Sequence, residues 1–259
     1  MRKNLFVLLV FCLSTFSAQI HAQSPTYEYK YKLGVDIPIA TITIGAGVTS
    51  LVKQKKNQPF TEAQVQSLVY NANKFDHSSI NRNFNKKIHL ASDIGMVATI
   101  ATPLLLLIDK KVRSDFKHIG PMWVETFALT FALTGMTKEL VRRTRPYVYY
   151  DDVPLSQKMK KDARASFFSG HTSMTASSAF FTAKIYADMN PNSKWKPLVW
   201  TSAAVLPAGI GFLRYSGGKH FWTDIITGYI VGAAVGILVP HLHRTKVTAM
   251  PTNIDLGVQ

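Results

Sequence analysis

Three groups of polar residues in this chain have types and spacings that suit the binding and transfer of a phosphate. The first group is Lys138 with Arg145 and Pro146, spaced K-x6-R-P. An arginine can bind phosphate oxygens as a planar fork, and a lysine can bind them as a point charge. Pro146 stops a helix and keeps the preceding residue extended. Taken alone, this group is also typical of a basic cluster beside a membrane helix.

The second group is the tripeptide Ser169-Gly170-His171, which opens an apolar run. Free backbone N–H groups at a helix start bind anions, and glycine lets the backbone approach closely. The Ser169 hydroxyl adds a donor, and His171 can deliver a proton to a leaving oxygen. An N-capping serine followed by an incidental histidine would have the same sequence.

The third group is Arg214, His220 and Asp224, spaced R-x5-H-x3-D. His220 and Asp224 are four residues apart and share one face if that segment is helical. A carboxylate can hold an imidazole N–H and fix its tautomer, which leaves the other ring nitrogen free as a nucleophile. The alternative is an interfacial histidine beside a helix-capping aspartate.

Together the three groups resemble the tripartite signature of the type 2 phosphatidic acid phosphatase superfamily. That signature is K-x6-R-P, then P-S-G-H, then S-R-x5-H-x3-D, and the order and spacing match throughout. Phe168 stands at the usual proline and Leu213 at the usual serine. Neither difference removes an ionisable residue.

The resemblance implies a role for each motif residue. His220 would attack phosphorus and form a phosphohistidine, Asp224 would orient it, and His171 would protonate the leaving group and then activate water. The residues expected to hold the phosphate are Lys138, Arg145, Ser169, Gly170 and Arg214. Three cations and backbone N–H groups can neutralise a phosphoryl group without a metal. The sequence has no HExxH pair and no carboxylate cluster for magnesium, so we expect no metal and no other cofactor.

The expected function is therefore metal-independent hydrolysis of a lipid phosphate or diphosphate, with a phospholipid or a polyprenyl phosphate as substrate. Three alternatives stay open: a broad periplasmic acid phosphatase on soluble monoesters, a vanadate-dependent haloperoxidase, and a non-catalytic lipid-binding membrane protein. The formal charge of +15 suits anionic lipid or an anionic substrate, and expected export argues against nucleic acid.

The elements that must position these residues are long apolar segments. The chain is 47% hydrophobic and 17% charged, which excludes long disorder. Its uncharged runs are Ile37–Val52, Ile94–Ile108, Thr126–Thr137, Ala165–Ala183, Pro197–Leu213 and Ile225–Pro240. Each is near the ~20 residues that cross a bilayer. They predict an all-α, mostly transmembrane bundle of five or six helices, with close packing at Gly228, Gly232 and Gly236.

The N-terminus reads as a secretory signal peptide over residues 1–22, because Arg2 and Lys3 precede an apolar stretch and Ala22 ends a plausible cleavage site. The only cysteine, Cys12, lies inside it. Residues 23–89 are expected to hold one apolar helix and a basic loop. Residues 90–242 would form the catalytic helical domain, and residues 243–259 a loosely ordered tail.

The three groups lie at the same end of the expected bundle, because the fourth and fifth runs make one excursion across it and back. Ile37–Val52 contains Pro38 and alternating threonine and isoleucine, so it is expected to be a poor spanning helix. Without that crossing the site faces the periplasm, and short basic loops such as Lys110–Lys117 fall inside. The expected location is a bacterial cell envelope, in the inner membrane.

Overall fold

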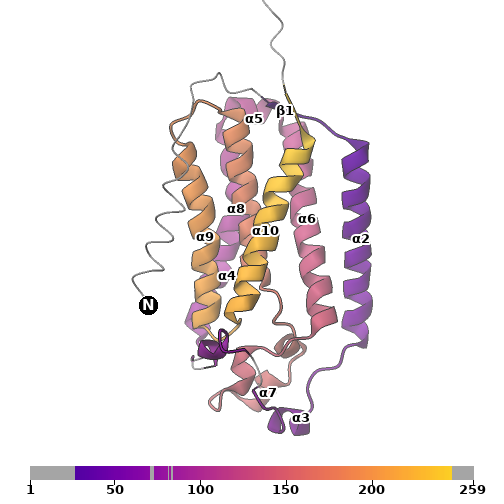
Figure 1. Cartoon of the computed structure of the whole chain (residues 1–259), viewed down its shortest axis with the longest axis vertical. Helices are drawn as coiled ribbons and strands as arrows, with labels where there is room; N and C mark the ends of the chain where they lie inside the picture. Colours follow the sequence, from indigo (N-terminus) through magenta and orange to yellow (C-terminus); the bar gives the residue numbers. More distant parts are fainter. Residues whose placement is uncertain (1–26, 71–72, 81, 83, 247–259) are drawn as a thin grey trace, which may run out of the picture.

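The computed structural model describes residues 27–70, 73–80, 82 and 84–246, and these form a nearly all-helical bundle (Figure 1). The signal peptide expected at residues 1–22 lies outside this range. The long helices are α2 (Leu33–Lys56), α4 (Lys86–Ile100), α6 (Phe116–Val141), α8 (Gly170–Met189), α9 (Lys196–Ser216) and α10 (Trp222–His243). Shorter elements are β1 (Tyr27–Tyr29), α3 (Glu62–Gln66), α5 (Lys110–Ser114), α7 (Leu155–Lys158) and β2 (Arg244–Lys246).

Four helical segments are long and apolar enough to cross a membrane. They are Leu33–Lys56, Lys86–Ile108, Lys196–Ser216 and Trp222–His243. Many of their apolar side chains face outward; Ile44 is 66% exposed, Val97 64% and Val205 60%. Such a surface is stable against lipid and costly in water. The chain is therefore an all-α membrane protein, as the apolar runs predict.

Helix α8 is the centre of the bundle, because α10, α9, α6 and α4 all pack against it. Its contact with α10 is close enough to require glycine. A Cβ atom at Gly232 would lie 2.1 Å from the carbonyl oxygen of Ser173, and one at Gly228 would lie 2.6 Å from that of Ser169. The close helix packing predicted from the glycine spacing is confirmed.

The chain direction brings the three motifs to one end of the bundle. The first motif lies at the C-terminal end of α6, the second at the N-terminal end of α8, and the third in the turn from α9 to α10. Figure 1 shows this end beside α3 and α7, with β1 and α5 at the opposite end. Short segments between α2 and α4 and between α6 and α8 cover the motif end.

The structure corrects the expectation that Ile37–Val52 spans poorly. This run lies within the continuous 24-residue helix α2, which is long and apolar enough to cross a membrane. Of the two threonines that alternate with isoleucine, Thr41 is bonded inside the helix, whereas Thr43 Oγ1 is buried with no hydrogen-bond partner among the described residues. Thr41 Oγ1 donates to the Ile37 carbonyl at 2.8 Å, and Thr49 Oγ1 does the same to Gly45. Bonds of this kind to the preceding turn give a threonine hydroxyl a partner within its own helix.

Several described elements begin or end near the expected segment boundaries. Helix α4 begins at Lys86, ahead of the expected boundary at residue 90, and His243 is the last residue of α10. Residues 244–246 form β2, which pairs antiparallel with β1 so that Tyr29 lies opposite Arg244. The first residues of the expected tail are thus ordered against the start of the described chain, and residues 247–259 lie outside the described range.

Candidate functional site

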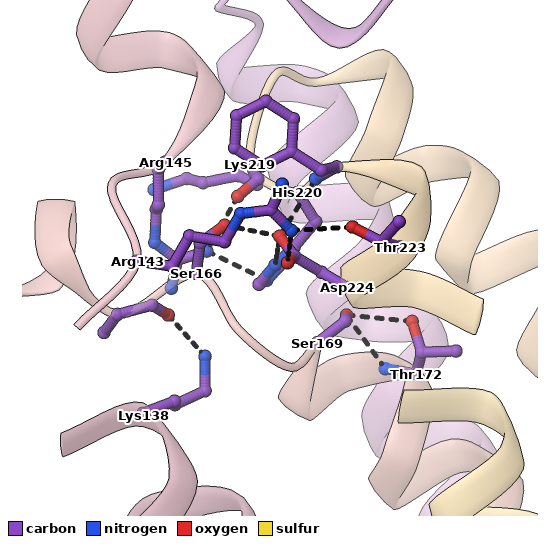
Figure 2. Close-up of polar contacts among 12 residues, drawn as sticks. Lys138, Arg143, Arg145, Ser166, Ser169, Thr172, Lys219, His220, Thr223 and Asp224 are labelled. Carbon is purple, nitrogen blue, oxygen red and sulfur yellow. Dashed lines mark hydrogen bonds and ion pairs between the residues drawn. The ribbon is translucent and has the colours of Figure 1, made fainter. Parts of the chain in front are cut away.

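The turn between α9 and α10 presents His220 in a defined tautomer. His220 is 1% exposed, and its Nε2 atom lies 2.9 Å from Arg145 Nη1 (Figure 2). A guanidinium can only donate, so Nε2 accepts and carries the lone pair. The ring proton is then on Nδ1, which lies 3.4 Å from Asp224 Oδ2. The imidazole therefore directs a nucleophilic nitrogen toward a cation and its N–H toward a carboxylate.

Asp224 is fully buried in the first turn of α10 and accepts several hydrogen bonds. Ser166 Oγ donates to Oδ2 at 2.5 Å, and the Phe221 backbone N–H donates to the same atom at 3.0 Å. Arg143 Nη1 donates to Oδ1 at 2.6 Å. A buried carboxylate with this many donors is fixed in position. It can thus hold His220 and stabilise positive charge on it.

Arg143 links Asp224 to a second buried carboxylate, Asp76. Arg143 Nη2 donates to Asp76 Oδ2 at 2.7 Å. Asp76 also accepts from the backbone N–H and the hydroxyl of Thr223, at 3.0 and 2.6 Å. Burial raises the pKa of Asp76, but the bonds from Thr223 and Arg143 outweigh it and the pKa lies below its ordinary value. The segment between α2 and α4 thus supports the site from outside the motifs.

Arg145 is the cation nearest the proposed nucleophile. Its other nitrogens are held by Asp162, whose backbone carbonyl accepts from Nε at 2.8 Å and whose Oδ1 accepts from Nη2 at 2.7 Å. Partial removal of Asp162 from water raises the pKa of this carboxyl, but the charges of Arg145 and Lys219 outweigh that effect and lower the pKa to well below its ordinary range. Asp162 is therefore ionised and fixes the arginine fork.

Lys138 and the start of α8 form the opposite wall of the site. Lys138 Nζ donates to the Ala165 carbonyl at 2.6 Å. A Cβ atom on Gly170 would lie 3.6 Å from Lys138 Cε, so the glycine brings the two elements together. Ser169 is the N-cap of α8; its hydroxyl accepts from Thr172 N at 3.4 Å and contacts Thr172 Oγ1 at 2.9 Å. In this structure that hydroxyl caps the helix, and its phosphate-binding role stays a prediction.

His171 and Arg214 meet at a third carboxylate, Asp93 on α4. His171 Nε2 lies 2.6 Å from Asp93 Oδ1, and Arg214 Nη1 lies 3.4 Å from the same oxygen. Arg214 Nη1 also donates to Ser92 Oγ at 3.0 Å. Arg214 Nε is buried and has no hydrogen-bond partner among the residues that the structure describes. This N–H is available to an anion.

Positive charge dominates the site. Burial lowers the pKa of His220 well below its ordinary value, and the charges of Arg145 and Lys138 lower it further. Burial and Arg145 also lower the pKa of Lys219 to about 8, although Asp162 opposes them. Both shifts favour the neutral form of a base that is surrounded by cations. The neutral form of the His220 ring is therefore favoured, and the surrounding arginines could bind an anion.

Sequence reasoning missed the residues that support the motifs. These are Asp76, Asp93, Arg143, Asp162 and Ser166. Their contacts join residues far apart in the chain, so spacing alone gave no signal for them. Arg143 is the supporting residue for which the sequence offers a signal, because it lies inside the K-x6-R-P segment. At this site the carboxylates are engaged by arginines and by His171. The group of His, Asp and Glu side chains that could hold a metal, within the described part of the chain, lies elsewhere, at Asp36, Glu125 and His243.

The chain is similar in sequence to a protein family and to several named phosphatases. Residues 123–248 match the PAP2 superfamily. The chain is 32% identical to rat phospholipid phosphatase 1 over 88 residues, which is 32% of this chain and 31% of the relative. It is 28% identical to human phospholipid phosphatase 2 over 155 residues, covering 49% and 54% of the two chains. It is 27% identical to lipid A 4'-phosphatase of Porphyromonas gingivalis over 146 residues, covering 56% and 58%.

A solved structure is also similar, a transmembrane PAP2-type phosphatidylglycerolphosphate phosphatase from Bacillus subtilis. The two chains are 20% identical, with a TM-score of 0.43 over 92% of this chain and 94% of that one. The matched region spans between 31% and 58% of the length of the three curated relatives described above.

Proposed function

Since the chain belongs to the PAP2 superfamily through residues 123–248, we propose that it hydrolyses a lipid phosphate or diphosphate through a phosphohistidine on His220. One observation carries this proposal. Arg145 Nη1 can only donate to His220 Nε2, so the nitrogen that faces the cations holds the lone pair. The nucleophile and the charge that would receive a phosphoryl group are thus adjacent.

In the first step, His220 Nε2 attacks phosphorus while the bond from phosphorus to the leaving oxygen breaks. His171 donates a proton to that oxygen, so the leaving group departs as an alcohol or a phosphate. Asp224 stabilises the positive charge that the ring gains when Nε2 is phosphorylated. Arg145, Arg214 and Lys138 offset the charge on the equatorial oxygens, which is the main requirement of phosphoryl transfer.

In the second step, neutral His171 takes a proton from water, and the resulting hydroxide attacks the phosphorus of the phosphohistidine. The bond from phosphorus to Nε2 breaks, and the electron pair returns to His220 as inorganic phosphate forms. Asp93, 2.6 Å from His171 Nε2, stabilises the protonated form of His171 in this step. Two moderate barriers replace one high barrier, which is the advantage of covalent catalysis.

A lipid is the favoured substrate because the site lies at the end of a bundle whose outer surface is apolar. The relatives include phospholipid phosphatases and a lipid A 4'-phosphatase, which act on lipids by name. The substrate class, a phospholipid or a polyprenyl phosphate, is therefore proposed for this chain. Tyr147 and Tyr150 beside the site are buried and therefore offer no surface to a lipid tail. The surface proposed for the tail is the exposed apolar side chains of the helices.

The test is phosphate release by the purified protein from a panel of phosphatidate, phosphatidylglycerophosphate, polyprenyl diphosphate, lipid A and a soluble monoester, with EDTA present. We expect turnover of at least one lipid and loss of that turnover in His220→Ala. The matched control is His241→Ala, which removes an exposed imidazole at the other end of α10. Turnover by His220→Ala at the wild-type rate would contradict the covalent mechanism, and activity confined to the soluble ester would contradict the lipid substrate.

We also propose that the catalytic end faces the periplasm from a bacterial inner membrane. Basic loops at the opposite end, Lys110–Lys117, Lys194–Lys196 and Arg244–Lys246, support this orientation. Because α2 is long enough to cross, β1 must then lie in the cytoplasm, and residues 1–22 would not be a cleaved export signal. Alkaline phosphatase fusions after residues 60 and 155 should be active and a fusion after 115 inactive. The reverse pattern, with a cleaved N-terminus, would place the site in the cytoplasm.

A further inference from the structure

A second cluster of ionisable side chains lies at the end of the bundle away from the catalytic site. Asp36 in the first turn of α2, Glu125 on α6 and His243 at the end of α10 each offer one atom, and these atoms lie within 4.8 Å of one another. His243 is only 3% exposed. The three residues are far apart in the sequence, so no sequence motif indicates the cluster.

The hydrogen bonds of His243 leave the two carboxylates of this cluster without a neighbouring positive charge. Its Nδ1 atom lies 2.8 Å from the Val239 carbonyl, so Nδ1 must carry a proton and donate it. Its Nε2 atom faces Asp36 Oδ1 at 2.8 Å and Glu125 Oε2 at 3.7 Å. In the neutral ring, the Nε2 lone pair would point at two carboxylates. A metal ion among these three atoms would balance the two carboxylates.

Nearby basic side chains do not supply that charge. Lys32 Nζ donates to the carbonyls of Leu242 and Arg244, and the Arg244 side chain lies 3.7 Å from Asp188. A proton on Nε2 would link it to Asp36 alone. The ion pairs of Glu125, among the residues that the structure describes, would then consist of one contact, 3.7 Å from Glu125 Oε2 to His243 Nε2. A metal ion can accept all three atoms at once.

The donor set, one imidazole nitrogen and two carboxylate oxygens within 4.8 Å of one another, suits a first-row metal. Zinc binds histidine nitrogen and carboxylate oxygen at about 2.0–2.2 Å in a tetrahedron, which separates ligand atoms by roughly 3.3–3.6 Å. The observed separations from Nε2, 2.8 and 3.7 Å, lie on either side of that range. Metal-binding histidines commonly donate their other ring N–H to a backbone carbonyl, as His243 Nδ1 does to Val239. A cavity of about 190 Å³ adjoins the cluster, with room for water at the fourth position.

We propose that Asp36, Glu125 and His243 bind a divalent first-row transition metal, for which Zn²⁺ is the best fit. An imidazole with two carboxylates favours such a metal over Ca²⁺ or Mg²⁺, which prefer oxygen alone. The ion would tie α2 to α6 and α10. Glu125 and Lys138 are 13 positions apart on α6, or about 20 Å at 1.5 Å per residue, so the metal lies far from the phosphate. Its role is structural, and it is independent of the proposed phosphatase activity.

The experiment uses the full chain, purified in detergent without a histidine tag and stripped with a chelator. Zn²⁺ is titrated at pH 7.5 by calorimetry, and thermal unfolding is followed with and without the ion. We expect one Zn²⁺ per chain and a rise in Tm of at least about 3 °C at saturation. Glu125→Gln and His243→Gln should each weaken binding at least tenfold. His241→Gln is the matched control, since His241 is an exposed imidazole two residues away, and it should bind as the wild type does.

Three results would overturn the proposal. The first is a stripped wild-type chain that takes up no Zn²⁺, which would mean that a proton links the cluster. The second is binding that survives both glutamine substitutions, and the third is binding that His241→Gln abolishes. If His243→Gln fails to fold, Glu125→Gln decides alone, because it keeps the buried imidazole and its bond to Val239. Phosphate release in EDTA is a separate readout, so failure here leaves the catalytic proposal intact.

Discussion

Arg143 provides a sharp test of how the site is held together. It is not one of the motif residues, yet it pairs with two fully buried carboxylates, Asp224 at 2.6 Å and Asp76 at 2.7 Å. Its guanidinium also lies 4.1 Å from the centre of the Phe221 ring. Replacing it by glutamine removes the positive charge between the two acids. We expect Arg143→Gln to lower both stability and turnover.

The expected size follows from burial. Removing one partner of a buried ion pair costs about 3–5 kcal/mol, because the remaining charge is left without compensation. For a chain of this size, that loss corresponds to a Tm decrease of roughly 6–20 °C. Turnover should fall as well, since Asp224 loses the strongest of the contacts that fix it beside His220.

The assay is thermal unfolding in detergent together with phosphate release. Arg142→Gln is the matched control, because the neighbouring arginine contacts the Gln58 carbonyl and pairs with no carboxylate in the described range. A double substitution, Arg143→Gln with Asp76→Asn, should lose less than the sum of the single losses, with a coupling of about 0.5–3 kcal/mol. A Tm for Arg143→Gln within 2 °C of the Arg142→Gln value, with no coupling, would refute the proposed support.

Three further predictions concern pH, packing and proton transfer. Because burial and Arg145 lower the pKa of His220, the acid limb of the kcat/KM profile should have its midpoint below pH ~6.5. A midpoint at or above that value would contradict the shift. The same shift means that the unfolded state binds the proton more readily, so this contribution to stability is lost as pH falls below about 6.5. Gly232→Ala should lower Tm by several degrees, since its Cβ would lie 2.1 Å from the Ser173 carbonyl, whereas Gly209→Ala, with nothing within 4 Å, should leave Tm unchanged. Asp93→Asn should lower kcat about 10–100-fold without raising KM, because it disturbs the proposed proton donor His171. A lower Tm with no loss in kcat would indicate a purely structural role for Asp93.

The helices could be predicted from the sequence because both lipid and the protein interior select apolar residues. Every uncharged run named from the sequence falls largely within a helical segment of the structure. The weak point was Ile37–Val52, where threonines alternate with isoleucines. In water such alternation favours a strand, but in α2 the hydroxyls of Thr41 and Thr49 bond to carbonyls of the preceding turn. A short-range pattern could not show that the surroundings would be apolar on most sides.

The motif residues were predictable for a different reason. Their spacing is fixed by helix ends, so Lys138, Arg145 and His220 keep local signatures. The residues that hold them have none. Asp76 comes from the loop after α3, and Asp162 from the segment before α8; each is placed by tertiary contacts. Asp76 is a polar residue in a polar stretch, and nothing nearby marks it as fully buried.

Each of the two arginines proposed to bind phosphate already contacts a carboxylate, and this has a consequence for the proposed binding. Asp162 pairs with Arg145 and Asp93 lies beside Arg214; their side chains are 50% and 53% exposed, whereas the arginines are buried. Buried cations without counterions would repel one another strongly. The two aspartates lower that repulsion while remaining in contact with solvent. An entering phosphate would therefore compete with these aspartates for the two arginines. Its binding free energy would depend on how far each aspartate can move away from its arginine toward water.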